Sequence, residues 1–170
     1  LETIREPIEK SPFPAYHKFD SFYGKPGSKE LEASLVYVES PFPLLLDWDL
    51  KTTTKRIRIH EKCADSLAQV LEQTLEEYSP AMIRTLGIDR FAGSYVNRPM
   101  RGGSKPSTHA YGAAVDFYAG RNGLTTRCPQ ALFCSPAYEP WIRIWESNGW
   151  TSLGRAIGRD WMHFQAGAVK

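Results

Sequence analysis

The chain of 170 residues carries 21 lysine and arginine side chains and 19 carboxylates, a formal net charge of +2 at pH 7. This small and dispersed charge excludes nucleic acid as an expected partner. No apolar run is long enough to cross a membrane, and residues 1–20 hold too many charges and prolines for a signal peptide. The length suits one domain that buries its core without help from disulfides.

The N-terminal part of the chain predicts an extended arm. Residues 1–30 are rich in proline, lysine and glutamate, and their prolines argue against a regular helix. We place the arm at residues 1–21 and a single domain at residues 22–170. The chain begins with Leu1 rather than methionine, so a removed targeting segment is compatible with the sequence but not visible in it.

Short strands are expected next, at residues 35–38 and 44–48, with Pro41 and Pro43 breaking the run between them. In residues 55–58 basic side chains alternate with apolar ones, as on the solvent face of a strand. These segments predict the first part of a sheet.

The clearest helix is expected at residues 66–78, where apolar positions recur on one face. The Ser79-Pro80 pair ends this helix and begins a second one that extends to Gly87. Further strands are expected at residues 91–96, 113–118 and 161–165, and a further helix at residues 140–148. The sequence therefore predicts an α+β fold, with helices packed against a small antiparallel sheet.

One segment holds two residue types that bind zinc. His109 and Asp116 would lie roughly 23 Å apart along an uninterrupted strand, whereas ligands of one zinc ion lie about 2 Å from the metal. The chain between them must therefore turn back. Gly112 is the natural pivot, because glycine adopts backbone angles closed to other residues. The small apolar residues 113–115 then suit a buried strand that ends by presenting Asp116.

A second segment supplies the remaining chemistry. His163 would be the third ligand and would leave a fourth position for water, as catalytic zinc requires. Asp160 lies three residues earlier, so a short turn can hold it near that water as a general base. A lone histidine is more often a core or surface residue, and we assign His17 and His60 to such roles. The combination of the two segments favours a zinc site on the open face of the sheet.

These segments resemble a known family. Ser-x-His-x-Tyr-Gly-x-Ala-x-Asp at residues 107–116, followed by Asp-Trp-Met-His at residues 160–163, is similar to zinc peptidases that cut the peptide stems of peptidoglycan. The family includes D-alanyl-D-alanine carboxypeptidases and dipeptidases, and L-alanyl-D-glutamate endopeptidases of phage endolysins. Residues 93–102 and 145–155 extend the similarity, and residues 23–27 look like the start of the phage-type branch.

The resemblance implies the α+β fold and a set of site residues. It implies His109, Asp116 and His163 as zinc ligands and Asp160 as the base. It also implies an arginine upstream of the first histidine that stabilises the oxyanion. Arg98 fits the Arg-Pro position of the family, and Arg101 is the alternative or a substrate contact.

Two further side chains have open assignments. Ser107 is expected to hydrogen-bond either the substrate or the turn around His109. Tyr111 is expected to line the cleft, with packing as its alternative role. The dipeptidase branch generally has glutamate where this chain has Asp160, which favours the endopeptidase branch.

The expected function is therefore zinc-dependent hydrolysis of peptidoglycan stem peptides between L-alanine and D-glutamate. The alternatives are a D-alanyl-D-alanine carboxypeptidase and a non-catalytic module that binds peptidoglycan or a partner through the same groove. A lytic effector delivered into a rival's periplasm would share the same chemistry. We expect a monomer that acts in the periplasm or cell wall after secretion, release or delivery.

The three cysteines fit no structural zinc site. Cys128 and Cys134 are close enough in sequence to pair in an oxidising compartment if the loop between them folds back, or they remain free thiols. Cys63 falls on the apolar face of a helix and is expected to be a buried thiol.

Overall fold

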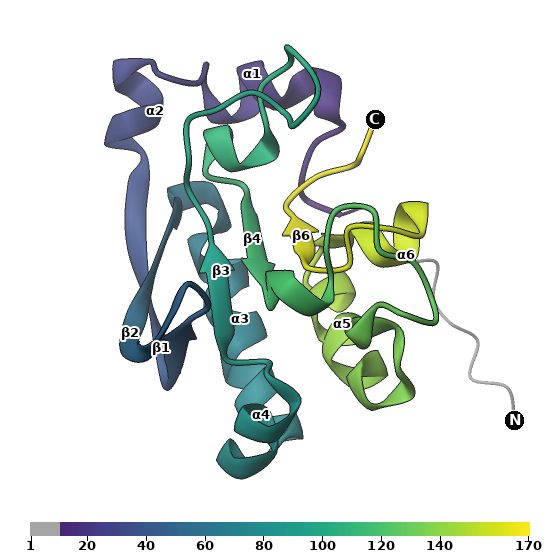
Figure 1. Ribbon diagram of the computed structural model, residues 1–170. Coiled ribbons are helices and arrows are strands. Elements are labelled where there is room, and N and C mark those ends of the chain that lie inside the picture. The colour runs from purple at the N-terminus through teal and green to yellow at the C-terminus, as the bar shows by residue number, and fades with distance from the viewer. Residues whose placement is uncertain (1–10) are drawn as a thin grey trace, which may run out of the picture.

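The computed structural model describes residues 11–170 and shows an α+β fold built on one open sheet (Figure 1). The six strands follow the order β2-β1-β3-β4-β6-β5, with β1 and β3 parallel and every other neighbouring pair antiparallel. Their bounds are Leu35–Leu46 (β1), Asp49–His60 (β2), Arg90–Gly93 (β3), Ala114–Phe117 (β4), Thr151–Ser152 (β5) and His163–Gln165 (β6).

Residues 11–170 also form six α-helices and five 3-10 turns, of which η1, α1 and α2 precede the first strand. The α-helices are Phe19–Tyr23 (α1), Lys29–Ala33 (α2), Glu61–Glu77 (α3), Pro80–Leu86 (α4), Glu139–Ser147 (α5) and Leu153–Ile157 (α6). The 3-10 turns are Tyr16–Lys18 (η1), Thr108–Tyr111 (η2), Ala119–Arg121 (η3), Leu132–Cys134 (η4) and Pro136–Tyr138 (η5). Among residues 11–170, every helix is too short or too polar to span a bilayer.

The expected strand break at Pro41 and Pro43 was wrong, because β1 continues through both prolines. The pairing of β1 with β2 shifts between Glu39, opposite Arg56, and Leu44, opposite Thr54. The extra residues form a bulge, and a bulge tolerates proline because it interrupts the hydrogen-bond ladder.

Helix α3 begins earlier than expected because His60 caps it. The His60 side chain accepts a hydrogen bond from the backbone N–H of Lys62 at 3.1 Å, and its Nε2 atom lies 2.9 Å from the carbonyl oxygen of Tyr23. Side-chain capping satisfies an N–H group that has no partner within the helix. His60 thus has the structural role expected for it.

The core lies between the sheet and helices α3 and α5. α3 packs against β1 and also against α5 (Figure 1). Trp145 of α5 stacks on Phe164 of β6 with ring centroids 4.6 Å apart. Because side chains alternate along a strand, the neighbours of Phe164 on β6 point to the opposite face of the sheet. His163 therefore projects away from the helical layer.

The described part of the expected arm is folded, which corrects the expectation of an extended segment at residues 1–21. Residues 16–23 form η1 and α1, and Phe19 is fully buried against Tyr111 at 5.2 Å between ring centroids. Tyr23 donates a hydrogen bond to the carbonyl oxygen of Ala166 at 2.7 Å. Pro12 and Pro14 precede the helical turns and do not interrupt them, and burial of the aromatic side chains stabilises these turns. Residues 1–10 lie outside the described part of the chain.

Candidate metal centre

Three predicted ligands meet on the face of the sheet opposite the helical layer. Asp116 on β4 and His163 on β6 are direct cross-strand partners. The Asp116 carboxylate lies between two imidazoles, with Oδ2 3.1 Å from Nε2 of His109 and Oδ1 3.0 Å from Nδ1 of His163. One ligand atom from each residue lies within 4.8 Å of the others, so this buried group could hold a metal ion.

Gly112 provides the reversal that brings His109 back to β4, as the sequence predicted. It ends η2 in the left-handed region with φ +68°. A Cβ atom at this position would lie 2.6 Å from the side chain of Leu35 and 3.0 Å from the backbone nitrogen of His60. Both the backbone angle and the close approach therefore require glycine.

Hydrogen bonds fix which nitrogen of each ring faces Asp116. Nδ1 of His109 lies 2.6 Å from the carbonyl oxygen of Ser94, which can only accept, so Nδ1 donates this bond and Nε2 is the ring nitrogen that faces Asp116. Nε2 of His163 lies 2.9 Å from Oε1 of Gln165. The Gln165 amide is oriented by its donation to the carbonyl oxygen of Ala168 at 3.0 Å. Such contacts behind a ligand orient it for metal binding.

The electrostatics of the group also suit a cation. Burial alone would raise the pKa of the Asp116 carboxyl, but the charges and hydrogen bonds of His109 and His163 hold that pKa well below its usual range. Burial alone would lower the pKa of His163, and its contact with Asp116 raises that pKa instead. Asp116 is thus ionised, and two imidazoles and one carboxylate form a donor set that divalent transition metals use.

Asp160 stands next to this group in a constrained backbone conformation. Its φ is +59°, a left-handed value that residues other than glycine rarely adopt and that costs about 1 kcal/mol or more. Burial raises the pKa of its carboxyl, against the opposing effect of the nearby His163. Its Oδ1 atom is buried and has no hydrogen-bond partner among the described residues. The carboxylate therefore has capacity left for a further hydrogen bond.

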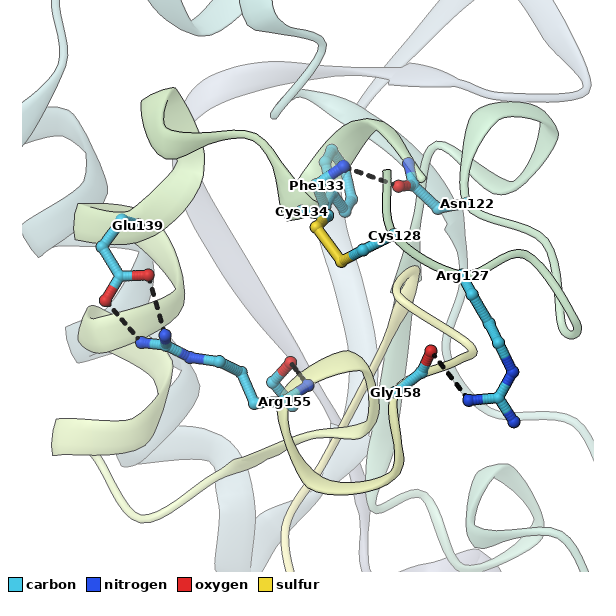
Figure 2. The surroundings of a disulfide bond; sticks show 9 residues. Asn122, Arg127, Cys128, Phe133, Cys134, Glu139, Arg155 and Gly158 are labelled. Atoms are coloured by element: carbon cyan, nitrogen blue, oxygen red, sulfur yellow. Dashed lines mark hydrogen bonds and ion pairs between the residues drawn. A yellow bond between two sulfur atoms is a disulfide. The ribbon is translucent and has the colours of Figure 1, made fainter. Parts of the chain in front are cut away.

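A loop closed by a disulfide bond lies near the segment that leads to Asp160, because Arg127, just before the bridge, donates a hydrogen bond to the carbonyl oxygen of Gly158 (Figure 2). Cys128 and Cys134 are bonded, which settles the pairing that the sequence left open. Asn122 accepts a hydrogen bond from the backbone of Phe133 at 2.8 Å through its side chain, and one from the backbone N–H of Met162 at 3.3 Å through its carbonyl oxygen. Asn122 therefore links the disulfide-closed loop to the segment that follows Asp160.

A cavity of about 320 Å³ lies over the three ligands. Arg98 and Arg101 reach it from the segment between β3 and η2, and Asp160 lines it from the turn before β6. Arg98 is half-buried, with a guanidinium N–H donated to the carbonyl oxygen of Pro99 at 3.1 Å, while Arg101 is exposed. The structure thus brings both candidate arginines to the cavity.

The two open assignments have different outcomes. The Ser107 side chain accepts the backbone N–H of His109 at 3.2 Å, so it stabilises the turn, and it also borders the cavity. Tyr111 is buried, donates to Asp20 at 2.6 Å and does not line the cavity. Of the two roles left open for Tyr111, the structure shows packing and not a place in the cleft, because Phe19 and α1 hold its ring in the core.

Sequence reasoning missed two supports and one cation of the site. Gln165 and Thr108 both contact Nε2 of His163, the latter at 3.1 Å. Their positions next to predicted ligands, on the same strand or turn, are the signal that could have revealed them. Arg159 also lines the cavity. Its place beside Asp160 gave no such signal, because surface arginines are common next to turns.

Comparisons of the chain with protein-family models, with curated proteins and with solved structures found no match.

Proposed function

We propose that this protein is a zinc-dependent peptidase that hydrolyses peptidoglycan stem peptides between L-alanine and D-glutamate. One observation carries the proposal: the carboxylate of Asp116 lies between two oriented imidazoles, and the unpartnered carboxylate of Asp160 borders the same cavity. Two imidazoles, one carboxylate and an adjacent free acid are what a catalytic zinc site needs. The motif resemblance supplies the substrate class.

The chemistry assigns a separate role to each group. A bound zinc ion supplies a Lewis acid that makes water nucleophilic near neutral pH. His109, Asp116 and His163 would hold the ion. Asp160 would accept the proton of the attacking water, and burial, which raises the pKa of its carboxyl, makes it a stronger base for that step.

The substrate carbonyl acquires negative charge during this attack. We assign the hydrogen bond to that oxygen to Arg98, because this residue lines the cavity and has no carboxylate partner among residues 11–170. We further propose that the protein acts as a monomer in the periplasm or cell wall, where this substrate is found.

The test is digestion of purified peptidoglycan by the zinc-loaded protein, with the new ends identified by mass spectrometry. Muramyl-L-alanine with a free carboxyl group and new D-glutamate amino termini are expected. Release of D-alanine would instead indicate a carboxypeptidase. The His163→Ala variant serves as the control, since it should lose both the metal and the activity. If the protein binds peptidoglycan but no new chain ends are found, it is a non-catalytic binding module and the peptidase proposal is wrong.

A further inference from the structure

Three arginines line the cavity over the candidate metal centre, and the charge of one of them, Arg159, acts to lower the pKa of the neighbouring Asp160 carboxyl. The three are Arg98, Arg101 and Arg159, and none forms an ion pair with a carboxylate in the described part of the chain. Elsewhere in the fold, several arginines do pair with carboxylates: Arg58, Arg84, Arg90, Arg143 and Arg155. The cavity therefore offers guanidinium groups to an anionic ligand.

The three arginines approach the metal group from different sides. Arg98 and Arg101 follow β3, whereas Arg159 precedes β6. β4, which carries Asp116, lies between β3 and β6 in the sheet. The segments that carry Arg98 and Arg159 therefore come from opposite sides of β4 in the strand order, and both residues line the one cavity. If Arg98 serves the oxyanion, Arg159 is left to bind another part of the substrate.

The surroundings of Arg159 suit a carboxylate. The side chain is half-buried, and within residues 11–170 its one hydrogen bond is a long one of 3.5 Å to the carbonyl oxygen of Leu124. A guanidinium has five donors, so most of its capacity remains free. Leu124, Leu153 and Ile157 line the same cavity and provide apolar surface. Apolar neighbours reduce solvent screening and strengthen a charged hydrogen bond.

We propose that Arg159 binds a substrate carboxylate on the residue that follows the scissile bond, and so makes the enzyme selective for acidic stem peptides. This inference rests on the proposed peptidase function. In a stem peptide cut between L-alanine and γ-linked D-glutamate, the group bound is the free α-carboxylate of D-glutamate. A paired guanidinium and carboxylate form two parallel hydrogen bonds, which a neutral amide cannot reproduce.

The test compares two synthetic stem peptides that differ only at that group, a free α-carboxylate in one and a primary amide in the other. Hydrogen bonds to charged groups contribute about 1.5–3 kcal/mol, which predicts an approximately 10- to 100-fold higher kcat/KM for the acid. Arg159→Gln should make kcat/KM for the acid peptide about equal to that for the amide peptide, mainly by raising KM for the acid peptide. Arg159→Lys should restore part of the preference.

Arg121→Gln is the matched control, since it removes the same charge from an exposed position that does not line the cavity. It should leave the preference for the acid unchanged. Equal kcat/KM for the two peptides with the unmodified protein would overturn the inference. Loss of the preference in Arg101→Gln, with Arg159→Gln unaffected, would also overturn it.

A binding measurement separates this inference from the proposed function. Calorimetry with the D-glutamate product peptide, as free acid and as amide, should show tighter binding of the acid to the zinc-loaded protein, and Arg159→Gln should abolish the difference. If neither peptide is cut while the acid still binds more tightly through Arg159, the peptidase proposal fails and the carboxylate site stands. Equal binding of acid and amide would refute the carboxylate site whatever the activity.

Discussion

Gln165 determines how His163 faces the metal group. Its Oε1 atom lies 2.9 Å from Nε2 of His163, while its amide nitrogen donates to the carbonyl oxygen of Ala168 at 3.0 Å. The amide cannot rotate without losing the second bond. Gln165 therefore holds the imidazole in the tautomer whose Nδ1 can bind a metal.

Replacing Gln165 with methionine should weaken zinc binding. Methionine keeps the length of the side chain but accepts only weakly, so the His163 ring would lose its orientation. Loss of such a supporting contact typically costs about 10- to 100-fold in metal affinity. Competition with a chromogenic chelator measures this change. Gln69→Met, on the exposed face of α3, is the control and should bind zinc like the unmodified protein.

Asp160→Asn should separate the base from the ligands. Asparagine keeps the shape of the side chain and tolerates the left-handed backbone of this position, so zinc occupancy should stay near one per chain. It cannot accept the proton, and loss of a general base costs about 10²- to 10⁴-fold in rate. Elemental analysis and initial rates on the same preparation check both parts.

In contrast to Asp160→Asn, the Asp116→Asn variant should lose both the metal and the activity. If Asp160→Asn releases the metal while Asp116→Asn retains it, the roles of the two carboxylates are exchanged.

Removal of the disulfide should affect both stability and rate. The double variant Cys128→Ser with Cys134→Ser frees a short loop, which should lower the free energy of unfolding by about 2 kcal/mol. Zinc occupancy should not change, since no ligand lies in the loop. The rate should fall because the turn of Asp160 loses support from Asn122.

Denaturant unfolding and initial rates measure the two effects. The control is Cys63→Ala, which removes the free thiol and leaves the bridge intact. An unchanged rate in a clearly destabilised double variant would mean that the loop does not position Asp160.

The stability of the fold should depend on pH through His60. Burial lowers the pKa of this histidine from its ordinary value of 6.5, and its Nδ1 atom must stay unprotonated to accept the N–H of Lys62. As the pH falls, the unfolded chain takes up the proton first. The stabilisation is therefore complete above pH 6.5 and is lost as the pH falls through the lowered pKa of the folded state.

Unfolding free energies between pH 8 and pH 5 test this dependence. His60→Asn keeps a capping side chain without the titrating ring, so the curve of this variant should be flatter than that of the unmodified protein. Parallel curves for the two proteins would assign the pH dependence to other groups.

Local patterns in the sequence predicted much of the candidate site. The reversal at Gly112 follows from the spacing of His109 and Asp116, and the apolar run before Asp116 predicts a buried strand. Both features depend only on residues close together in the chain, so they can be predicted from the sequence alone. The same holds for α5, which was predicted at residues 140–148 and is found at Glu139–Ser147.

The parts that sequence reasoning missed depend on contacts between distant segments. Pro41 and Pro43 remain in β1 because β2 accommodates a bulge, which no local pattern specifies. The end of the expected arm is part of the core because Phe19 packs against Tyr111, which is distant in the sequence. The role of Arg159 depends on a cavity whose walls come from several elements.

The pairing of Asp116 opposite His163 has a consequence for how the chain folds. A shift of one residue between β4 and β6 would turn one of these side chains to the other face of the sheet. The three side chains can therefore bind one metal ion only when these two very short strands are paired in the native register. Because a ligand that binds only the native state stabilises that state by mass action, the ion would select the native alignment of the last strand during folding, before it takes part in any turnover.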